Sequence, residues 1–162
     1  MKKSGTESNA QDNNSIICSE DIRLLSALGF MSARQGYIVP AIRIFEALTV
    51  LRPTHTFPYI GLALANLYIG NSNEAANILL NRGLKACPED PEIHLYLSLA
   101  LQISGFNKES EIVADTLINS YEIDESQLQL ARSVSDLAKG KKLNKDWPQP
   151  AVIKEISETE TS

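Results

Sequence analysis

The residues of this sequence best suited to chemistry are a histidine and two carboxylates, His94 with Asp90 and Glu92. An imidazole beside a carboxylate is a common pair for general acid–base catalysis near neutral pH. All three residues fall in the first turns of a predicted helix, and helical spacing places His94 on the face that packs against the next helix. We therefore interpret His94 as a structural histidine, and we expect that the protein is not an enzyme.

The two cysteines and the other histidine also indicate little chemistry. Cys18 and Cys87 have neither the density of a disulfide scaffold nor the spacing of metal ligands, and reduced thiols are expected in a cytosolic chain. His55 lies in a predicted loop beside Pro53, with no second metal ligand nearby in sequence. The sequence thus predicts no metal and no cofactor, and it points to a binding function.

Composition and charge narrow the class of partner. The chain has 162 residues, of which 43% are hydrophobic and 22% charged, as in ordinary soluble proteins. Its formal net charge of -5 disfavours nucleic acid and anionic membranes, because both require a basic surface. The first residues, MKKSGTESNAQDNN, lack the apolar region of a secretory signal, so we expect a cytoplasmic protein.

The elements that would position a binding site are organised around an uncharged stretch from Thr56 to Gly70. Thr56 is expected to cap a helix there, Pro58 suits its first turn, and Gly70 is expected to end it. Polar residues on both sides leave too short an apolar core for a membrane span. Because the stretch is apolar on nearly every face, we predict a central helix with neighbours on several sides and no membrane insertion.

The chain divides into three segments. Residues 1–18 are polar and predicted to be disordered, residues 19–138 form an α-helical domain, and residues 139–162 form a flexible tail. Ser19, Asp90 and Asp124 have the side chains of helix caps. Helical periodicity between them predicts seven helices with short connections and no strand.

An internal repeat relates these helices. Turn glycines recur 34 and 35 residues apart at Gly36, Gly70 and Gly105, and we place the one extra residue of the longer step in the turn GNSNEA. The first helix of each pair carries a leucine and then a small residue, at Leu28-Gly29, Leu62-Ala63 and Leu97-Ser98. The second carries a small residue and, four positions later, an apolar one, at Ala41 and Phe45, Ala76 and Leu80, Ser110 and Ala114. Small residues facing each other allow two antiparallel helices to approach closely, and stacked pairs bury a shared core.

At these positions the chain resembles the tetratricopeptide repeat family, over about residues 20–122. The first pair matches best, and Pro53 and Pro88 close the first two pairs. The third pair departs from the pattern, since Ala114 stands at its phenylalanine position and no proline follows at Glu122. The resemblance implies an all-α solenoid of three helix-turn-helix repeats with a C-terminal capping helix.

In such a stack the first helices line a concave face. The repeat register points Arg23 and Ser26 toward it, together with a set of apolar residues that would form a partner-binding groove: Phe30, Phe57, Ile60, Leu64, Tyr68, Leu95, Leu99 and Ile103. An apolar groove suits an amphipathic helix of another protein. The alternative is that these residues belong to the core, covered by the capping helix or by the tail around Trp147.

The short acidic repeat unit with an apolar groove also resembles the small chaperones of bacterial type III secretion, and more closely those of needle subunits, in lines such as ALGFMSARQGYIVPAIRIFEALTVLRP. The resemblance implies a chaperone that holds an aggregation-prone secreted subunit and prevents its premature assembly, with a small helical co-chaperone in some members. A translocator chaperone of the same systems is the near alternative. A scaffold that works by self-association is a second class.

Overall fold

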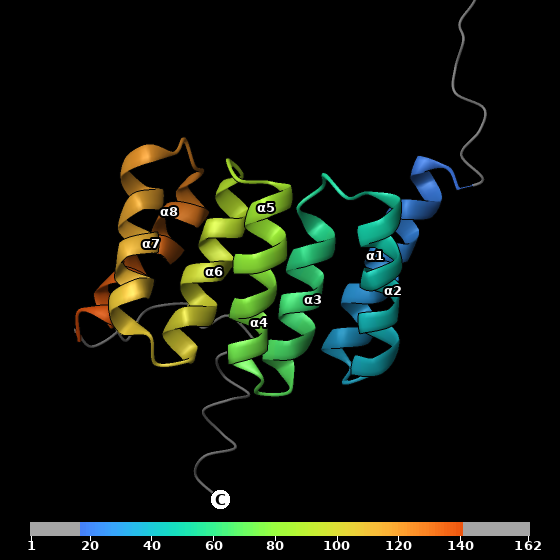
Figure 1. The fold of residues 1–162 in the computed structure, drawn as a ribbon, viewed down its shortest axis with the longest axis horizontal. Helices are drawn as coiled ribbons and strands as arrows, with labels where there is room; N and C mark the ends of the chain where they lie inside the picture. The colour runs from blue at the N-terminus through green and yellow to red at the C-terminus, as the bar shows by residue number, and fades with distance from the viewer. Residues whose placement is uncertain (1–16, 141–162) are drawn as a thin grey trace, which may run out of the picture.

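The computed structural model describes residues 17–140, and these are all α-helical apart from turns, as the sequence predicts (Figure 1). In chain order the elements are α1 (Ser19–Arg34), α2 (Ile38–Leu51), α3 (Phe57–Tyr68), α4 (Ser72–Ile78), the π-helical turn η1 (Leu79–Gly83), α5 (Leu84–Ala86), α6 (Pro91–Ile103), α7 (Asn107–Ser120) and α8 (Glu125–Ala138). The predicted disordered start falls mainly on residues 1–16, and the predicted flexible tail mainly on residues 141–162. Both stretches lie outside the described residues.

Three antiparallel hairpins stand side by side in one row, which makes the fold a short solenoid (Figure 1). The first helices are α1, α3 and α6. The second helices are α2, the continuous helix α4–η1–α5, and α7. Helix α8 packs against α6 and α7 at one end of the row.

One glycine follows the end of each of the helices α1, α3, α6 and α8. Gly36, Gly70, Gly105 and Gly140 have φ angles of 82°, 73°, 82° and 76°, a conformation that other residues adopt only with strain. Gly140 follows Gly105 by 35 residues, the same step that separates Gly105 from Gly70. Helix α8 is therefore the first helix of a fourth unit as well as a cap, a relationship that the sequence analysis did not recognise.

The position of the extra residue in the second repeat differs from the prediction. Ala75 and Leu79 stand five and nine positions after Gly70, the same distances as Ala41 and Phe45 from the first turn glycine, and all four are fully buried at 0% exposure. The turn GNSNEA therefore has the normal length. The predicted pair, Ala76 and Leu80, is one residue out of register.

The extra residue lies in the π-helical turn η1 instead. A π turn accommodates one more residue per turn than an α-helix, because its hydrogen bonds span five residues. After this turn the buried Gly83 occupies the place that Leu48 has in the first repeat. Leu80, the second residue of this turn, is 52% exposed.

Two predicted helix caps are replaced by other contacts. Thr56 does not cap α3, because its hydroxyl donates a hydrogen bond to the Asp90 carboxylate. The other oxygen of Asp90 accepts from the backbone N–H of Glu92 at 2.9 Å, so the predicted Asp90 cap is confirmed and also ties α6 to the start of α3. At α1 the capping position is Cys18 rather than Ser19, and the Cys18 N–H donates to Asp21 at 3.0 Å.

The uncharged helix α3 lies at the centre of the stack, as predicted. It packs against α1, α2, α4 and α6, and nine of its twelve residues are buried. Within residues 17–140, no helix is both long and apolar enough to cross a bilayer.

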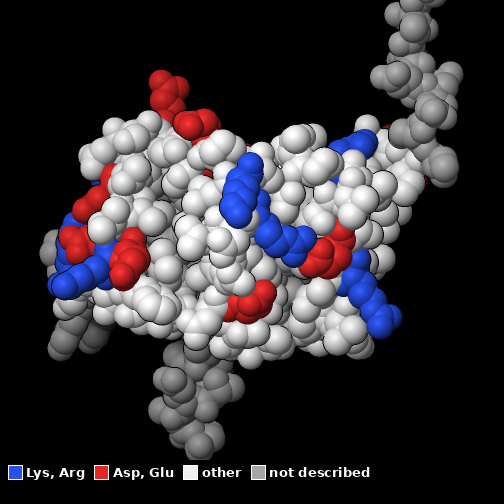
Figure 2. Space-filling view, in the orientation of Figure 1, with Lys and Arg blue, Asp and Glu red and all other residues white. Residues whose placement is uncertain are grey.

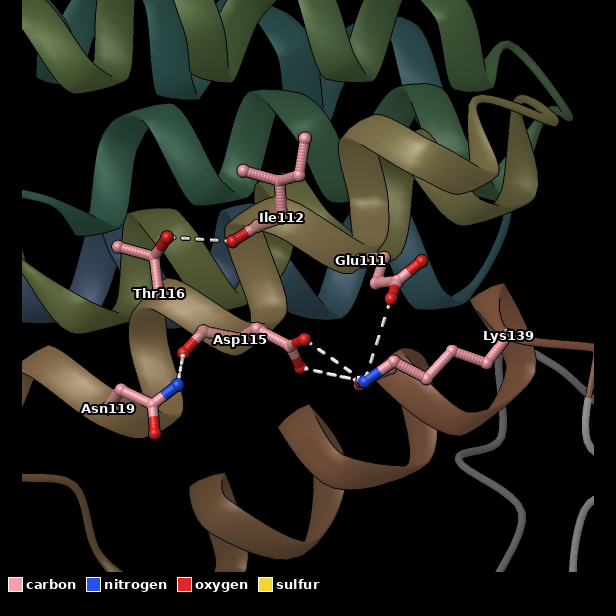
Figure 3. A network of polar contacts seen from close by, with 7 residues as sticks. Glu111, Ile112, Asp115, Thr116, Asn119 and Lys139 are labelled. Atoms are coloured by element: carbon pink, nitrogen blue, oxygen red, sulfur yellow. Dashed lines mark hydrogen bonds and ion pairs between the residues drawn. The ribbon is translucent and has the colours of Figure 1, made fainter.

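Polar contacts attach the end of α8 to α7 (Figure 3). The Asp115 carboxylate accepts hydrogen bonds from Ser135 Oγ at 2.7 Å and from Lys139 Nζ at 3.0 Å. Lys139 Nζ also lies 3.7 Å from a carboxylate oxygen of Glu111. The Ser135 hydrogen bond, followed by that of Lys139, lowers the pKa of Asp115.

Candidate functional site

The structure separates the eight predicted groove residues into two groups. Phe30, Phe57, Leu64, Tyr68 and Ile103 are half-buried on the first helices and keep surface that a partner could contact. The other three are buried, with exposures of 4% for Ile60, 5% for Leu95 and 7% for Leu99.

The three buried residues are covered by the neighbouring unit. Ile60 belongs to the core that α3 shares with α6. Leu95 packs against Leu117 of α7 and Ala131 of α8, and Leu99 packs against Ala114 and Val134 of the same two helices. The prediction that these three line an open groove is therefore corrected, because each faces the next first helix in the row.

The five half-buried residues lie on the first helices α1, α3 and α6, and we call the groove surface predicted for them the concave face. The edge of the Phe30 ring packs on Phe45, with ring centroids 4.8 Å apart. Phe57 makes a similar contact with His55 at 6.0 Å. Leu64 and Ile103 rest on the core between α3 and α6. These contacts therefore hold the side chains of the concave face in place, and the surface that they leave exposed is apolar.

Tyr96 is a further member of this face that the sequence analysis missed. It rests half-buried on the same core as Leu64, and burial, followed by the charge of Glu92 and the proximity of Tyr68, raises its pKa. Counted back from the turn glycine, Tyr96 stands where Gly61 and Ala27 stand in the other repeats. The repeat register would have revealed Tyr96, because it is a large residue at a position where the other two repeats have small ones.

A depression of about 350 Å³ opens at one end of the concave face, beside Phe57. Its lining contains two guanidinium groups and an imidazole and no carboxylate, and its residues are Ser19, Ile22, Arg23, Ser26, Arg52, His55 and Phe57. Arg52 donates to the backbone oxygen of Leu51 at 3.1 Å. Among the described residues neither Arg23 nor Arg52 forms an ion pair in this depression, although Arg23 also lines a neighbouring depression that contains Glu20 and Asp21.

The first turns of α6 and α8, at the other end of the row, carry acidic residues. Burial, followed by the charges of Asp90 and Asp124, raises the pKa of Glu92. The first turn of α1 is also acidic, with Glu20 and Asp21, so the first helices share an acidic start. On the face seen in Figure 2, basic and acidic side chains are interspersed with uncharged surface, and neither charge forms a continuous patch.

His94 has the structural role that its helical position predicts. Its Nδ1 lies 3.0 Å from the Asp90 carbonyl oxygen, which can only accept a hydrogen bond, so this nitrogen carries the proton. Its Nε2 lies 3.3 Å from the Tyr121 hydroxyl, and the two rings stack with centroids 4.9 Å apart. Both ring nitrogens are occupied within the protein. In the part of the chain that the structure describes, no three His, Cys, Asp or Glu side chains gather in a metal-binding arrangement.

Solved structures with a similar fold include proteins of type III secretion. SycD, the translocator chaperone of Yersinia enterocolitica, is similar with a TM-score of 0.65 and 20% sequence identity, over 76% of this chain and 91% of that chain. SycD in complex with a peptide of the translocator YopD gives 0.62 and 20%, over 75% and 95%. PcrH in complex with the chaperone binding region of PopD gives 0.63 and 18%, over 76% and 92%.

No protein-family model matches this sequence, and a search of the curated proteins gives no significant match. The identities to the solved structures are low, so the likeness concerns the fold. The described chain has the tetratricopeptide-like fold of the type III secretion translocator chaperones.

Proposed function

We propose that this protein is a cytoplasmic chaperone of type III secretion, which holds an apolar segment of a secreted translocator subunit on its concave face before export. The observation that carries the proposal is the apolar, half-buried surface of Phe30, Phe57, Leu64, Tyr68 and Ile103 on first helices whose core positions hold it rigid. An apolar surface of this kind on a soluble protein is typical of a binding site.

Burial of apolar surface sets an upper limit to the free energy of client binding. A client segment that buries about 400 Å² of apolar surface gains roughly 10 kcal/mol at about 25 cal/mol per Å², before the cost of ordering the segment is subtracted. An amphipathic helix that presents one apolar face is the simplest client. Covering that face would prevent client molecules from assembling with one another.

The comparisons favour a translocator client over the needle subunit that the sequence resemblance suggests. SycD is a translocator chaperone and was solved with a peptide of the translocator YopD, and PcrH was solved with the chaperone binding region of PopD. We therefore take the translocator chaperone as the main proposal. The needle-subunit chaperone with a helical co-chaperone becomes the alternative.

Co-expression with the translocator subunits of its own secretion system tests the proposal. Leu64→Asp places a charge on the concave face, and Leu80→Asp, on the outer side of the second repeat where Leu80 is 52% exposed, is the matched control. We expect the client to remain soluble with the wild-type protein and with Leu80→Asp, and to be lost to the pellet with Leu64→Asp. Circular dichroism must show equal helicity for both variants.

Translocators that stay insoluble beside the wild-type protein would contradict the proposal. If the needle subunit alone is kept soluble, the alternative holds. A variant at the edge of the face, Phe57→Asp, repeats the test should Leu64→Asp lower the helicity.

A self-associating scaffold is the second candidate, and a separate surface favours it. Leu24, Leu28 and Met31 of α1 are 75%, 46% and 53% exposed. The residues that correspond to Leu28 in the next two repeats, Leu62 and Leu97, are buried against the preceding hairpin at 1% exposure each. No described hairpin precedes α1, so this end of the solenoid presents an apolar edge.

A further inference from the structure

The depression beside Phe57 lies between the first turns of α1 and α3, and we call it the α1–α3 depression. The first turns of α1, α6 and α8 carry carboxylates, whereas that of α3 carries none. Fifteen positions before their turn glycines, the first, third and fourth units have an acidic residue: Asp21, Asp90 and Glu125. The second unit has His55 there. The chain therefore lines this depression with an imidazole where the repeat has a carboxylate.

Arg52 is a second departure from the repeat. It is the C-cap residue of α2, and the C-cap residues of the other two second helices are Cys87 and Tyr121. Cys87 is buried and Arg52 is half-buried, so this position faces inward. The Arg52 guanidinium donates one hydrogen bond, from Nη1 to the carbonyl oxygen of Leu51 at 3.1 Å. Because a guanidinium has five N–H donors, four remain available to solvent or to a ligand.

Arg23 lines the α1 side of the depression, and its charge is shared with another site. It also lines the neighbouring depression that contains Glu20 and Asp21, and these two carboxylates attract it in that direction. Neither of the two carboxylates lines the α1–α3 depression. Arg52 and His55 therefore give this depression its basic character, and Arg23 adds to it.

The α1–α3 depression continues into the concave face. Phe57 belongs to both, and its ring meets the His55 ring nearly at a right angle, with centroids 6.0 Å apart. Ile22, which is buried, supplies a second apolar wall. The hydroxyl of Ser26 donates to the carbonyl oxygen of Ile22 at 2.7 Å, so the charged donors here come from arginine and histidine side chains. A segment bound on the concave face would therefore reach a basic site at the α3 start.

We propose that the α1–α3 depression binds the carboxylate of an aspartate or glutamate side chain at one end of the client segment on the concave face. The inference rests on the proposed function for its partner, and it adds a charged group to the description of that partner. Arginine binds a carboxylate through two parallel hydrogen bonds, which are about twice as strong as hydrogen bonds between neutral groups. Such a contact fixes the position and direction of the segment, since apolar burial is not directional.

The apolar walls favour an acidic side chain over inorganic phosphate. The methylene groups of aspartate and glutamate can bury apolar surface against Ile22 and Phe57, and phosphate has none to bury. The preferred ligand is thus a carboxylate attached to an apolar group.

A titration with phenylacetate tests the site without a client. Phenylacetamide has nearly the same shape and no charge, so it is the matched ligand. The chain has two histidines, and proton NMR at constant pH and ionic strength can follow both rings. We expect phenylacetate to shift the His55 signals, to leave those of His94 in place, and to bind about fivefold more tightly than phenylacetamide or better. Equal affinity of the two ligands, or no shift of His55 with either, would overturn the proposal.

Variants show whether the guanidinium groups hold the carboxylate. Arg52→Gln should lower the affinity for phenylacetate to that for phenylacetamide, and Arg43→Gln, at an exposed position of α2, is the matched control. Circular dichroism checks the helicity of both, and Arg23→Gln repeats the test should Arg52→Gln unfold the chain. Inorganic phosphate that shifts His55 as far as phenylacetate does would make the depression a general anion site. The assignment to a carboxylate would then be wrong.

The client assay separates this inference from the proposed function. We expect that replacing one acidic residue of the bound translocator segment by its amide weakens binding about fivefold or more, and that Arg52→Gln causes no further loss with the changed segment. A loss on amidation of the segment's C-terminal carboxylate alone would overturn the assignment to a side chain. Client binding that Arg52→Gln leaves unchanged overturns only the inference. Phenylacetate binding without client binding overturns only the proposed function.

Discussion

Gly61 of α3 lies directly against the ring of Phe45 of α2: a β-carbon added at Gly61 would stand 2.2 Å from Phe45 Cε1. The Phe45 ring cannot move aside easily, because it is fully buried at 0% exposure and also meets Gly29 and the Phe30 ring. The close approach of α2 and α3 thus depends on the missing side chain. This contact therefore fixes where α3, which carries Phe57, Leu64 and Tyr68 of the concave face, lies against α2.

Gly61→Ala should therefore destabilise the protein. Overpacking of this kind costs about 1–3 kcal/mol, while alanine regains up to about 1 kcal/mol of helix propensity, so we expect a net loss of about 1–2 kcal/mol in urea unfolding. Gly83→Ala is the control, because the one close approach of its β-carbon would be to the end of the Ile93 side chain, at 3.0 Å, while Tyr59 Cβ would stand at an ordinary 3.6 Å. Equal stability of Gly61→Ala and wild type would show that α2 and α3 can separate freely.

Deleting single residues tests where the second repeat carries its extra residue. Removal of Leu80 should convert η1 to α-helix and leave Ala75 and Leu79 in place, so stability should change by less than about 1 kcal/mol. Removal of Asn73 should rotate Ala75 and Leu79 by about 100° relative to the turn and cost more than about 3 kcal/mol. Thermal unfolding followed by circular dichroism measures both. The opposite ranking would place the extra residue in the turn.

The attachment of α8 should depend on pH through Asp115. Because its pKa is lowered in the folded protein, its contribution is present above the pKa of the unfolded chain and is lost as the pH falls through the folded value. Asp115→Asn should therefore flatten the loss of stability below about pH 4. At pH 7 it should cost less than about 1 kcal/mol, because the side chain is 40% exposed. Glu122→Gln, at an exposed carboxylate without an ion pair among the described residues, should retain the wild-type pH profile.

Glycine spacing was enough to predict the hairpins, because a turn that requires positive φ leaves a strong mark in the sequence. Gly140 continues the same glycine spacing and identifies α8 as the first helix of a fourth unit. The sequence analysis missed this relationship because it considered only complete helix pairs. The inward positions of α4 were harder to predict. A π turn shifts register inside a helix without any proline or glycine at the point where the shift begins.

The concave face was predicted in part, for a related reason. Helical periodicity gives the direction of each side chain but not the depth at which the next helix covers it. The repeat register directs Ile60, Leu95 and Leu99 toward the concave side, whereas in the structure the neighbouring helices bury all three. The same limit explains Thr56, whose hydroxyl bonds to Asp90 of the next repeat, since a local rule considers only its own helix.

The apolar edge of α1 leads to a last prediction, on self-association. If this edge is an interface, the wild-type protein should show a mass above that of a monomer in light scattering, and the mass should fall on dilution. Leu28→Lys with Met31→Lys should give a monomer at every concentration, because each lysine would have to be desolvated in the contact. Val50→Lys, at a position 80% exposed on α2, is the matched control and should associate like the wild type.

A wild-type protein that is monomeric at high concentration would contradict the scaffold. An associating double variant would move the interface to another surface. A monomeric double variant that still keeps its client soluble would show that the edge of α1 and the concave face work independently, because no residue is shared between them.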